Sequence, residues 1–410
     1  MNAIAQELAA NFDIEKLVPD FYADPYPTYR ALRQHEPVKR MRNGGYFLSR
    51  YDDLVTVYKN TKSFSSDKKK EFAPKYGTSL LYEHHTTSLV FNDPPAHTRV
   101  RRLIMGALSP RAIAGMEGDL VALVERLLDG LAAKRDVDLI EDFAAAIPIE
   151  VIGNLLGVPR QEREPLRGWS LAILGALEPV IGPEAFARGN SAVKEFLSYL
   201  ETLVARRRAK PGNPDRDVLT RLIQGEDNDE DGGERLSEKE LLHNCIFLLN
   251  AGHETTTNLI GNGLVTLSAI PSEKKRLIEN PGLIKTAVEE ILRFESSNQF
   301  GNRMTTERVE LGGVTLDRGT SITLGIGAAN RDPLQFSDPE NFDVARNPNR
   351  HLAFATGAHQ CAGMALARLE GAIAISHFLA RFPAYALKGS PVRGGRARFR
   401  GFLSIPCKIA

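Results

Sequence analysis

Apolar residues return every three or four positions along most of this chain, which is the spacing of one face of an α-helix. The longest such stretch spans Ser237–Ala269, with an S-x-x-E capping box at Ser237 and Glu240 and a stop at Pro271. It predicts a helix of about 33 residues, ~50 Å long and able to cross a whole domain. The same spacing predicts further helices over Ile113–Ala133, Ala192–Arg208, Leu283–Phe294 and Ala362–Phe382.

Strand signals are short and few. Asn43-Gly44 separates two alternating segments within Val38–Tyr51, which is typical of a β-hairpin. Val309–Ile326 predicts two or three short strands around Gly312-Gly313 and Arg318-Gly319. We therefore predict a mainly α-helical body with small β-sheets.

Composition is that of an ordinary globular protein, with 42% apolar and 25% charged residues in 410. A net charge of +1 gives no reason to expect nucleic acid or an anionic membrane as partner. The acidic segment Gly225–Glu234 predicts an exposed loop. The chain start lacks the features of a signal peptide, and no apolar run is long enough to span a membrane. Three cysteines (Cys245, Cys361, Cys407) are too few for a disulfide framework, so we expect a cytoplasmic protein.

The centre of the longest predicted helix consists of poor helix formers. Ala251–Asn258 reads AGHETTTN, and Glu254 places a charge among apolar turns. Thr255 follows Ala251 by one turn, so its hydroxyl can bond that carbonyl oxygen and open the helix locally. The result would be a polar notch that carries Thr255 and Glu254. The alternative is a simple kink with a solvated glutamate.

Cys361 lies in a glycine-containing loop directly before the predicted helix Ala362–Phe382. Unpaired N–H groups at a helix start favour a thiolate. Gly357 and Gly363 would let a flat ligand approach the backbone, and Phe354 could shield the sulfur from water. No Cys-x-x-Cys supplies a zinc or iron–sulfur set, so the sulfur would be a single axial ligand. The alternative is a buried free cysteine.

Several segments together resemble one known family. FATGAHQCAG, at Phe354–Gly363, resembles the haem-binding loop of the cytochrome P450 monooxygenases, with Ala355 where that family usually has glycine. AGHETT at Ala251–Thr256 is similar to the family's oxygen-activation motif, and EILR at Glu290–Arg293 is similar to its E-x-x-R motif. Other segments that resemble the family are Asp24–Arg33, Asp93–Arg102 and Ala328–Pro333. The resemblance covers essentially the full length and implies a single large α-rich domain, residues 1–410, with the cytochrome P450 fold.

The resemblance implies haem b (iron protoporphyrin IX) as cofactor and Cys361 as its iron ligand. The other residues expected to hold the haem are Phe354, Gly357 and Gly363 in the cysteine loop, and His97, Arg101, Arg303 and His359 at the propionates. Pro94 and Pro95 suit a helix start that places His97 and Arg101 on one face, where an anionic partner would offset their charge. Glu290 and Arg293 would brace the core behind the haem.

The implied activity is insertion of one atom of O₂ into a small or mid-sized hydrophobic organic substrate, by hydroxylation or dealkylation. Glu254 and Thr255 would relay protons. Electrons would come from an external iron–sulfur ferredoxin, since the chain has no flavin or nicotinamide fingerprint; Arg99, Arg102 and Arg350 are candidate docking charges. A monomer is expected.

Rival interpretations are a haem-thiolate peroxygenase, a non-catalytic haem-binding sensor and a zinc or redox-thiol protein. A peroxygenase would not need the acid–threonine pair, and a sensor would have no use for a proton relay. If the chain were a zinc or redox-thiol protein, it would bind no haem at all.

Substrate contacts are the least specified part of the sequence. Positions suggested by the family are Leu248, Ala251, Ser297, Phe300 and Phe402, with His84 and His85 as further candidates. The polar segment Ser296–Gln299, where the family often has proline at position 297, could hold a carboxylate of an organic acid or could satisfy only the backbone. Cys245 and Cys407 are expected to be packing residues.

Overall fold

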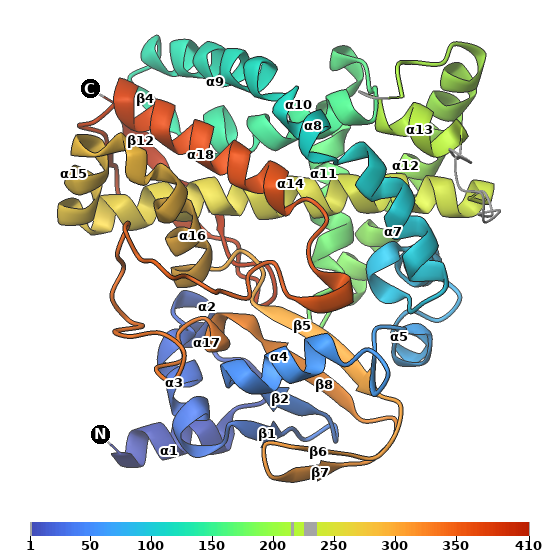
Figure 1. Ribbon diagram of the computed structural model, residues 1–410, viewed down its shortest axis with the longest axis vertical. Coiled ribbons are helices and arrows are strands. Elements are labelled where there is room, and N and C mark those ends of the chain that lie inside the picture. Colours follow the sequence, from blue (N-terminus) through green and yellow to red (C-terminus); the bar gives the residue numbers. More distant parts are fainter. Residues whose placement is uncertain (1, 215–216, 225–235, 410) are drawn as a thin grey trace.

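The computed structural model describes residues 2–214, 217–224 and 236–409. The acidic segment Gly225–Glu234 lies outside the described residues. A mainly helical body fills one end of the molecule, and the largest sheet with the N-terminal helices fills the other (Figure 1).

Helices account for most of the described chain. The α-helices are α1 (Asn2–Asn11), α2 (Pro19–Ala23), α3 (Tyr26–His35), α4 (Tyr51–Lys59), α5 (Lys69–Tyr76), α6 (Leu80–Thr87), α7 (Ala96–Ala107), α8 (Pro110–Ala114), α9 (Glu117–Ala132), α10 (Ala146–Leu155), α11 (Glu164–Gly175), α12 (Pro183–Ala209), α13 (Val218–Gln224), α14 (Glu238–Ala269), α15 (Pro271–Glu279), α16 (Ile284–Phe294), α17 (Ile326–Ala329) and α18 (Met364–Arg381). Short 3-10 turns are η1 (Leu89–Phe91), η3 (Arg160–Glu162), η4 (Pro281–Leu283) and η5 (Gly357–His359), and η2 (Ile140–Ala144) is a π-helix.

The helices predicted from apolar spacing all form, with shifted ends. Ile113–Ala133 is divided between α8 and α9, because α8 ends at Ala114 and Gly115 caps it. Ala192–Arg208 is the second part of the longer α12, whose first turns lack apolar periodicity but carry Pro183 at the favoured first helical position. The apolar pattern therefore located the helices, while Gly115 and Pro183 determined where two of them end or begin.

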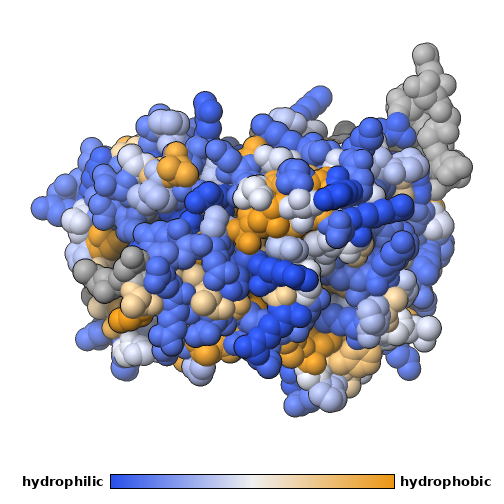
Figure 2. Space-filling view, turned by 90° about the horizontal axis from the view of Figure 1, so that it is seen from below, coloured by the Kyte–Doolittle hydropathy of each residue, from blue (hydrophilic) through white to orange (hydrophobic). Residues whose placement is uncertain are grey.

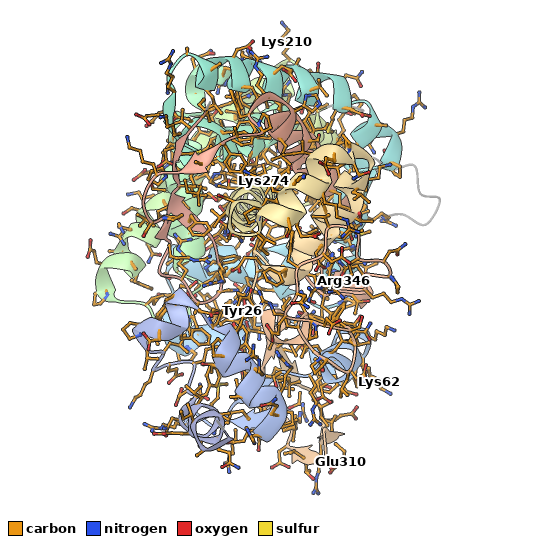
Figure 3. The ribbon with its side chains drawn as sticks, turned by 90° about the vertical axis from the view of Figure 1, so that its left-hand side faces the viewer. Tyr26, Lys62, Lys210, Lys274, Glu310 and Arg346 are labelled. Carbon is orange, nitrogen blue, oxygen red and sulfur yellow. The ribbon has the colours of Figure 1, made fainter. Side chains whose placement is uncertain are left out.

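Helix α14 is the axis of the body. Its capping box is present: the Ser237 hydroxyl accepts the Glu240 N–H at 3.2 Å, and the Glu240 carboxylate accepts the Ser237 N–H at 2.9 Å. The helix crosses the width of the molecule in Figure 1 and is seen end-on in Figure 3, with side chains packed around it. It contacts α10, α11, α12, α16 and α18.

The strands form small sheets, as predicted. They are β1 (Val38–Arg40), β2 (Tyr46–Leu48), β3 (Phe64–Ser65), β4 (Asp136–Asp138), β5 (Phe300–Thr305), β6 (Val309–Leu311), β7 (Val314–Leu316), β8 (Ser321–Gly325), β9 (Ala386–Leu387), β10 (Val392–Arg393), β11 (Phe402–Ser404) and β12 (Pro406–Lys408). The largest sheet has the order β1-β2-β8-β5-β3, in which only β2 and β8 run parallel. The predicted hairpin is β1–β2, and the short strands predicted within Val309–Ile326 are β6, β7 and β8.

The apolar core follows this division. The largest buried cluster joins α9, α12, α14, α16 and α18, for example through Leu128, Phe196, Ile260, Ile291 and Phe378. A second cluster packs α1–α3 on the five-stranded sheet. The surface at the sheet end is mainly hydrophilic, with separate apolar patches (Figure 2). Within the described residues, every helix is too short or too polar to cross a membrane.

Candidate functional site

A cavity of about 330 Å³ lies where the helical body meets the five-stranded sheet. Its wall is formed by α6, α7, α14, β5, the cysteine loop and the segment that joins β10 to β11. Of the residues singled out from the sequence, those in the wall are His84, His85, His97, Arg101, Leu248, Ala251, Thr255, Ser297, Phe300, Arg303, Phe354, His359, Cys361 and Gly363. Glu254, Gly357 and Phe402 are not among the lining residues.

Cys361 lines this cavity, and its residue surface is exposed, in contrast to the two buried cysteines. Its N–H donates to the carbonyl oxygen of Phe354 at 2.9 Å, which closes the loop, while Gly363 N–H hydrogen-bonds the sulfur. Burial raises the pKa of the Cys361 thiol, and the Gly363 N–H and the charges of Arg101 and Arg368 oppose that rise. A coordinated metal ion deprotonates a thiol, so these donors fit a sulfur that binds a metal from the cavity.

The cysteine loop takes its shape from two residues with left-handed backbone. Ala355 has φ of 53° and Gly357 has φ of 76°. A side chain on Gly357 would meet the carbonyl oxygen of Tyr58 at 2.5 Å, so the close approach there is to the backbone of α4. Gly357 is not in the cavity wall, and its lack of a side chain makes room for this carbonyl oxygen. Gly363 does line the cavity and has open space where a side chain would stand.

Four nitrogen-rich side chains gather at one edge of the cavity. The rings of His97 and His359 lie 3.9 Å apart, and Arg101 and Arg303 flank them. Both His97 nitrogens, Nε2 of His359 and Nε of Arg303 are buried without a hydrogen-bond partner. Burial and the neighbouring arginines lower the pKa of His97, and burial and then Arg303 lower that of His359 to about 2.

This cluster fits the propionates of a haem. Among the described residues, Arg101 and Arg303 form no ion pair with a carboxylate; they donate instead to the carbonyl oxygens of Gln360 and Asn302, each at 2.7 Å. Buried cations and orphaned N–H groups are costly unless an anion or acceptor meets them. Carboxylates on the cavity side would supply both.

The polar notch predicted in α14 is present as a hydroxyl at the cavity wall. Thr255 Oγ1 donates to the Ala251 carbonyl oxygen at 2.8 Å, as predicted. The helix nevertheless continues without a break, so the predicted opening is wrong: the hydroxyl shares the carbonyl without ending the helix. Gly252 has a packing role, because a side chain there would meet Ile152 at 2.5 Å.

Glu254 is buried on another side of α14. Arg396 Nη1 donates to both carboxylate oxygens, at 2.6 and 2.7 Å, while Arg396 Nη2 donates to Leu171 O at 2.9 Å. Burial raises the pKa of Glu254 to about 7, and Arg396 opposes the rise. The alternative of a solvated glutamate is therefore wrong. The sequence signal that could have found Arg396 is the arginine-rich stretch RGGRARFR before β11.

The E-x-x-R pair forms a fully satisfied buried network. Both side chains are 0% exposed, and Arg293 Nε and Nη2 each donate to Glu290 at 2.7 Å. The other Arg293 donors bind the carbonyl oxygens of Asn330, Pro339 and Asn341. Glu290 also accepts from Arg346, so the pair ties α16 to the segment that leads to the cysteine loop.

The substrate side of the cavity is partly as predicted. Leu248, Ala251, Ser297 and Phe300 line it, but Phe402 does not. Phe402 lies on β11 in the core, with the Arg393 guanidinium 4.1 Å from its ring, because only the turn before β11 reaches the cavity. That turn contributes Arg398 and Phe399, which sequence reasoning missed.

Only half of the polar segment Ser296–Gln299 faces the cavity. Ser296 donates to the Leu292 carbonyl oxygen at 2.7 Å. Gln299 donates to the Ser296 carbonyl oxygen at 2.7 Å and accepts from the Tyr29 hydroxyl. These two satisfy backbone and core groups, which leaves Ser297 and Asn298 at the cavity wall.

The remaining candidate residues are two histidines in the cavity wall, one arginine and two cysteines. Burial lowers the pKa of His84 well below its usual value and that of His85 to about 3, so both are neutral cavity residues. Within the described ranges, no group of three or more His, Cys, Asp or Glu side chains could hold a metal ion. Arg99 pairs with Glu240. Cys245 and Cys407 are buried, as expected of packing residues.

Comparison with known proteins gives the same family throughout. The family model described as cytochrome P450 matches residues 174–394. The chain is 34% identical over 371 residues to the biotin biosynthesis cytochrome P450 of Bacillus subtilis (90% of this chain, 91% of the relative). It is 36% identical over 389 residues to 6-deoxyerythronolide B hydroxylase of Saccharopolyspora erythraea (90% and 93%). The crystal structure of P450BioI with an acyl carrier protein ligated to hexadec-9Z-enoic acid matches with a TM-score of 0.89 and 33% identity, covering 95% of this chain and 99% of that one. The chain therefore belongs to the cytochrome P450 family of oxidoreductases.

Proposed function

We propose that this protein inserts one atom of O₂ into an apolar organic substrate held in the cavity. The observation that carries the proposal is that three features line one cavity: the Cys361 sulfur, the Thr255 hydroxyl and the cluster of His97, Arg101, Arg303 and His359. Members of the family bind haem b through a cysteine thiolate. Bound through Cys361, with His97, Arg101, Arg303 and His359 at its propionates, the haem would supply the activation of dioxygen.

The chain's own part in the reaction is to shield the site and to move protons. Thr255 would hold a proton donor at the cavity wall. Glu254, the next residue, would resupply it from the buried side of α14, because a group with pKa of about 7 exchanges protons readily near neutral pH. Arg396 would control how far the Glu254 carboxylate can move. This division of roles gives a physical reason for an acid beside the threonine, which a peroxygenase would not need.

The electron donor we propose is an iron–sulfur ferredoxin with an acidic surface. Arg102 and Arg350 are exposed. Arg101, the residue before Arg102, donates to the Gln360 carbonyl oxygen of the cysteine loop, and Arg350 shortly precedes that loop in sequence. Arg99 pairs with Glu240. Charge reversal at Arg102 and Arg350 should slow ferredoxin-supported reduction without changing haem content; unchanged reduction would contradict the assignment.

We also propose that residues 1–410 work as one domain, as a cytoplasmic monomer. All three cysteines are free, which suits a reducing compartment. The two relatives named above carry different functional names, so neither one's substrate is assigned to this chain.

The test of the proposal is the absorption spectrum of the reduced protein with CO, followed by O₂-dependent product formation. Wild-type protein should give the Soret band of a thiolate-bound haem, and Cys361→Ala should lose that band. Cys245→Ala is the matched control, because its thiol is buried in the core away from the cavity wall. A wild-type protein without the band, or a Cys361→Ala protein that retains it, would refute the proposal.

A further inference from the structure

Arg398 carries a guanidinium that faces the cavity without a carboxylate partner. Its Nη1 donates to Asn302 Oδ1 at 3.0 Å, and its buried Nε has no partner. Within the described part of the chain it forms no ion pair, whereas Arg400, two residues later, pairs with Glu295, and Arg396 pairs with Glu254. An enclosed guanidinium bonded only to a neutral amide is an unpaired charge, which an anion in the cavity would stabilise.

The backbone holds Arg398 in place from two directions. The N–H groups of Ala397 and Arg398 donate to the Glu178 carboxylate at 2.8 and 3.2 Å. The Arg398 carbonyl oxygen accepts the Gln299 N–H at 2.8 Å. The guanidinium is therefore presented by a fixed segment, which is the condition for a selective binding group.

Two buried polar atoms without hydrogen-bond partners lie beside the turn that carries Arg398. Asn298 and Phe399 form a β-bridge, and the Arg400 N–H donates to the Ser297 carbonyl oxygen at 2.8 Å. These contacts place Ser297 and Asn298 next to the turn that carries Arg398. Ser297 Oγ and Asn298 Oδ1 are buried at the cavity wall without partners. The Ser297 hydroxyl can therefore donate to an anion beside the cation, whereas Asn298 Oδ1 is an acceptor.

The electrostatics on this side of the cavity are positive. Burial first, and then the charge of Arg398, lower the pKa of Lys75 to about 8. Burial, Lys75 and Arg398 together depress the pKa of His85. The carboxylates that oppose this charge are Glu178, which accepts the two backbone N–H groups, and Glu71, which pairs with Lys68. The balance favours an anion at Arg398.

We propose that Arg398 binds the carboxylate of the substrate and that the substrate is an organic acid with an apolar body. The apolar body would contact Leu248, Ala251 and Phe300, which share the cavity with Arg398. Charge-assisted hydrogen bonds from a guanidinium to a carboxylate are strong and directional. This inference rests on the proposed monooxygenase function and adds the substrate class.

A haem propionate is the other source of a carboxylate in this cavity. We favour the substrate, because the propionates already have the four-membered cluster of His97, Arg101, Arg303 and His359. The two sources predict different results for Arg398→Gln: loss of acid binding in the first case, and faster haem loss in the second.

The experiment measures binding of matched acids and esters by the optical spin-state shift of the ferric holoprotein. The probes are decanoate, myristate and phenylacetate, each with its methyl ester. Wild-type protein should bind acids at least about tenfold more tightly than esters, and Arg398→Gln should lose about ten- to a hundredfold in acid affinity with ester affinity unchanged. Arg398→Lys should retain part of the preference. Arg393→Gln is the matched control, since Arg393 lies in the same arginine-rich stretch but outside the cavity wall.

The outcomes separate this inference from the proposed function. The reduced CO spectrum is recorded first, and absence of the thiolate-haem band would be a failure of the function. With the band intact, a wild type that binds no acid, or that prefers esters, overturns the role of Arg398, as does an Arg398→Gln protein that keeps the acid preference. Unchanged acid affinity with faster transfer of haem to apomyoglobin would reassign the guanidinium to a propionate and likewise overturn it.

Discussion

Arg396 Nη1 donates to both carboxylate oxygens of Glu254, at 2.6 and 2.7 Å, and joins the C-terminal segment to the middle of α14. The side chains are 17% and 8% exposed, respectively, so water screens this ion pair little. Two opposed effects meet at Glu254: burial disfavours its charge, while Arg396 favours it. The outcome, a pKa of about 7, puts the titration of this acid within the working range of an enzyme.

Removal of Arg396 should shift the pH dependence of turnover upward. Arg396→Gln deletes the cation that lowers the Glu254 pKa, so the carboxyl keeps its proton to higher pH. We expect the wild-type midpoint of kcat against pH near 7 and a higher midpoint in the variant. The measurement is product formation across the range with a saturating electron donor, and Arg393→Gln serves as control. Identical profiles in wild type and Arg396→Gln would show that Glu254 does not limit proton supply.

Glu254 should also make folding stability depend on pH. The folded protein holds the Glu254 proton up to about pH 7, whereas the unfolded chain releases it near the ordinary value of 4.5. The native state therefore binds more protons between these values, and this stabilising contribution is complete below the lower value and lost as pH rises through the upper one. We expect wild type to lose on the order of 1–3 kcal/mol relative to Glu254→Gln across this window. Urea unfolding at a series of pH values measures it; parallel curves would contradict the assigned pKa.

Ala355→Gly should stabilise the protein. Ala355 has φ of 53°, a left-handed conformation that costs a residue with a Cβ about 1–2 kcal/mol and costs glycine little. Part of the gain is lost to the greater freedom of glycine in the unfolded chain, so we expect a net gain of about 1 kcal/mol. Thermal unfolding of the holoprotein measures it. Ala353→Gly, in the same loop but without positive φ, is the control and should not stabilise.

Breaking the Glu290–Arg293 pair should be far more damaging than breaking a surface pair. Glu290→Gln leaves the Arg293 charge without a carboxylate at a site that is 0% exposed, at a cost of about 3–5 kcal/mol. Arg293→Gln should cost less, because Glu290 keeps its ion pair with Arg346. Arg381→Gln removes the exposed pair with Asp129 and should cost less than about 1 kcal/mol. Yield of folded holoprotein and its urea midpoint report both effects. Similar losses in the two pairs would mean that the buried network does not hold the core.

Sequence reasoning located the residues whose neighbours are local or whose motif is distinctive. Three features follow from short-range spacing and are present: the capping box of α14, the Thr255 hydroxyl bond to Ala251 and the β1–β2 hairpin. Residues whose role depends on distant backbone cannot be assigned from such spacing. Gly357 makes room for the carbonyl oxygen of Tyr58, some 300 positions earlier in the chain, and no spacing rule relates the two.

The C-terminal segment was the largest omission. Phe402 is apolar and close to residues that face the cavity, but strand alternation decides which side chains point inward, and the register of so short a strand as β11 is weakly specified by sequence. Arg396 and Arg398 lie two residues apart, yet one pairs with α14 and the other faces the cavity. Their partners come from α14 and β5, so only the folded chain distinguishes them.

Removal of the Arg303 charge should weaken haem retention. Arg303 Nε is buried without a partner, and its guanidinium lies with His97, His359 and Arg101 at the cavity edge where propionates fit. Since charge-assisted hydrogen bonds to a carboxylate contribute about 1.5–3 kcal/mol, Arg303→Gln should lose haem to apomyoglobin roughly ten- to a hundredfold faster than wild type. Arg308→Gln is the control, because Arg308 is a nearby arginine in the sequence that is exposed and does not line the cavity. Equal haem-loss rates in the two variants would mean that Arg303 and its neighbours at the cavity edge do not hold the propionates, even if the CO spectrum shows an intact thiolate bond.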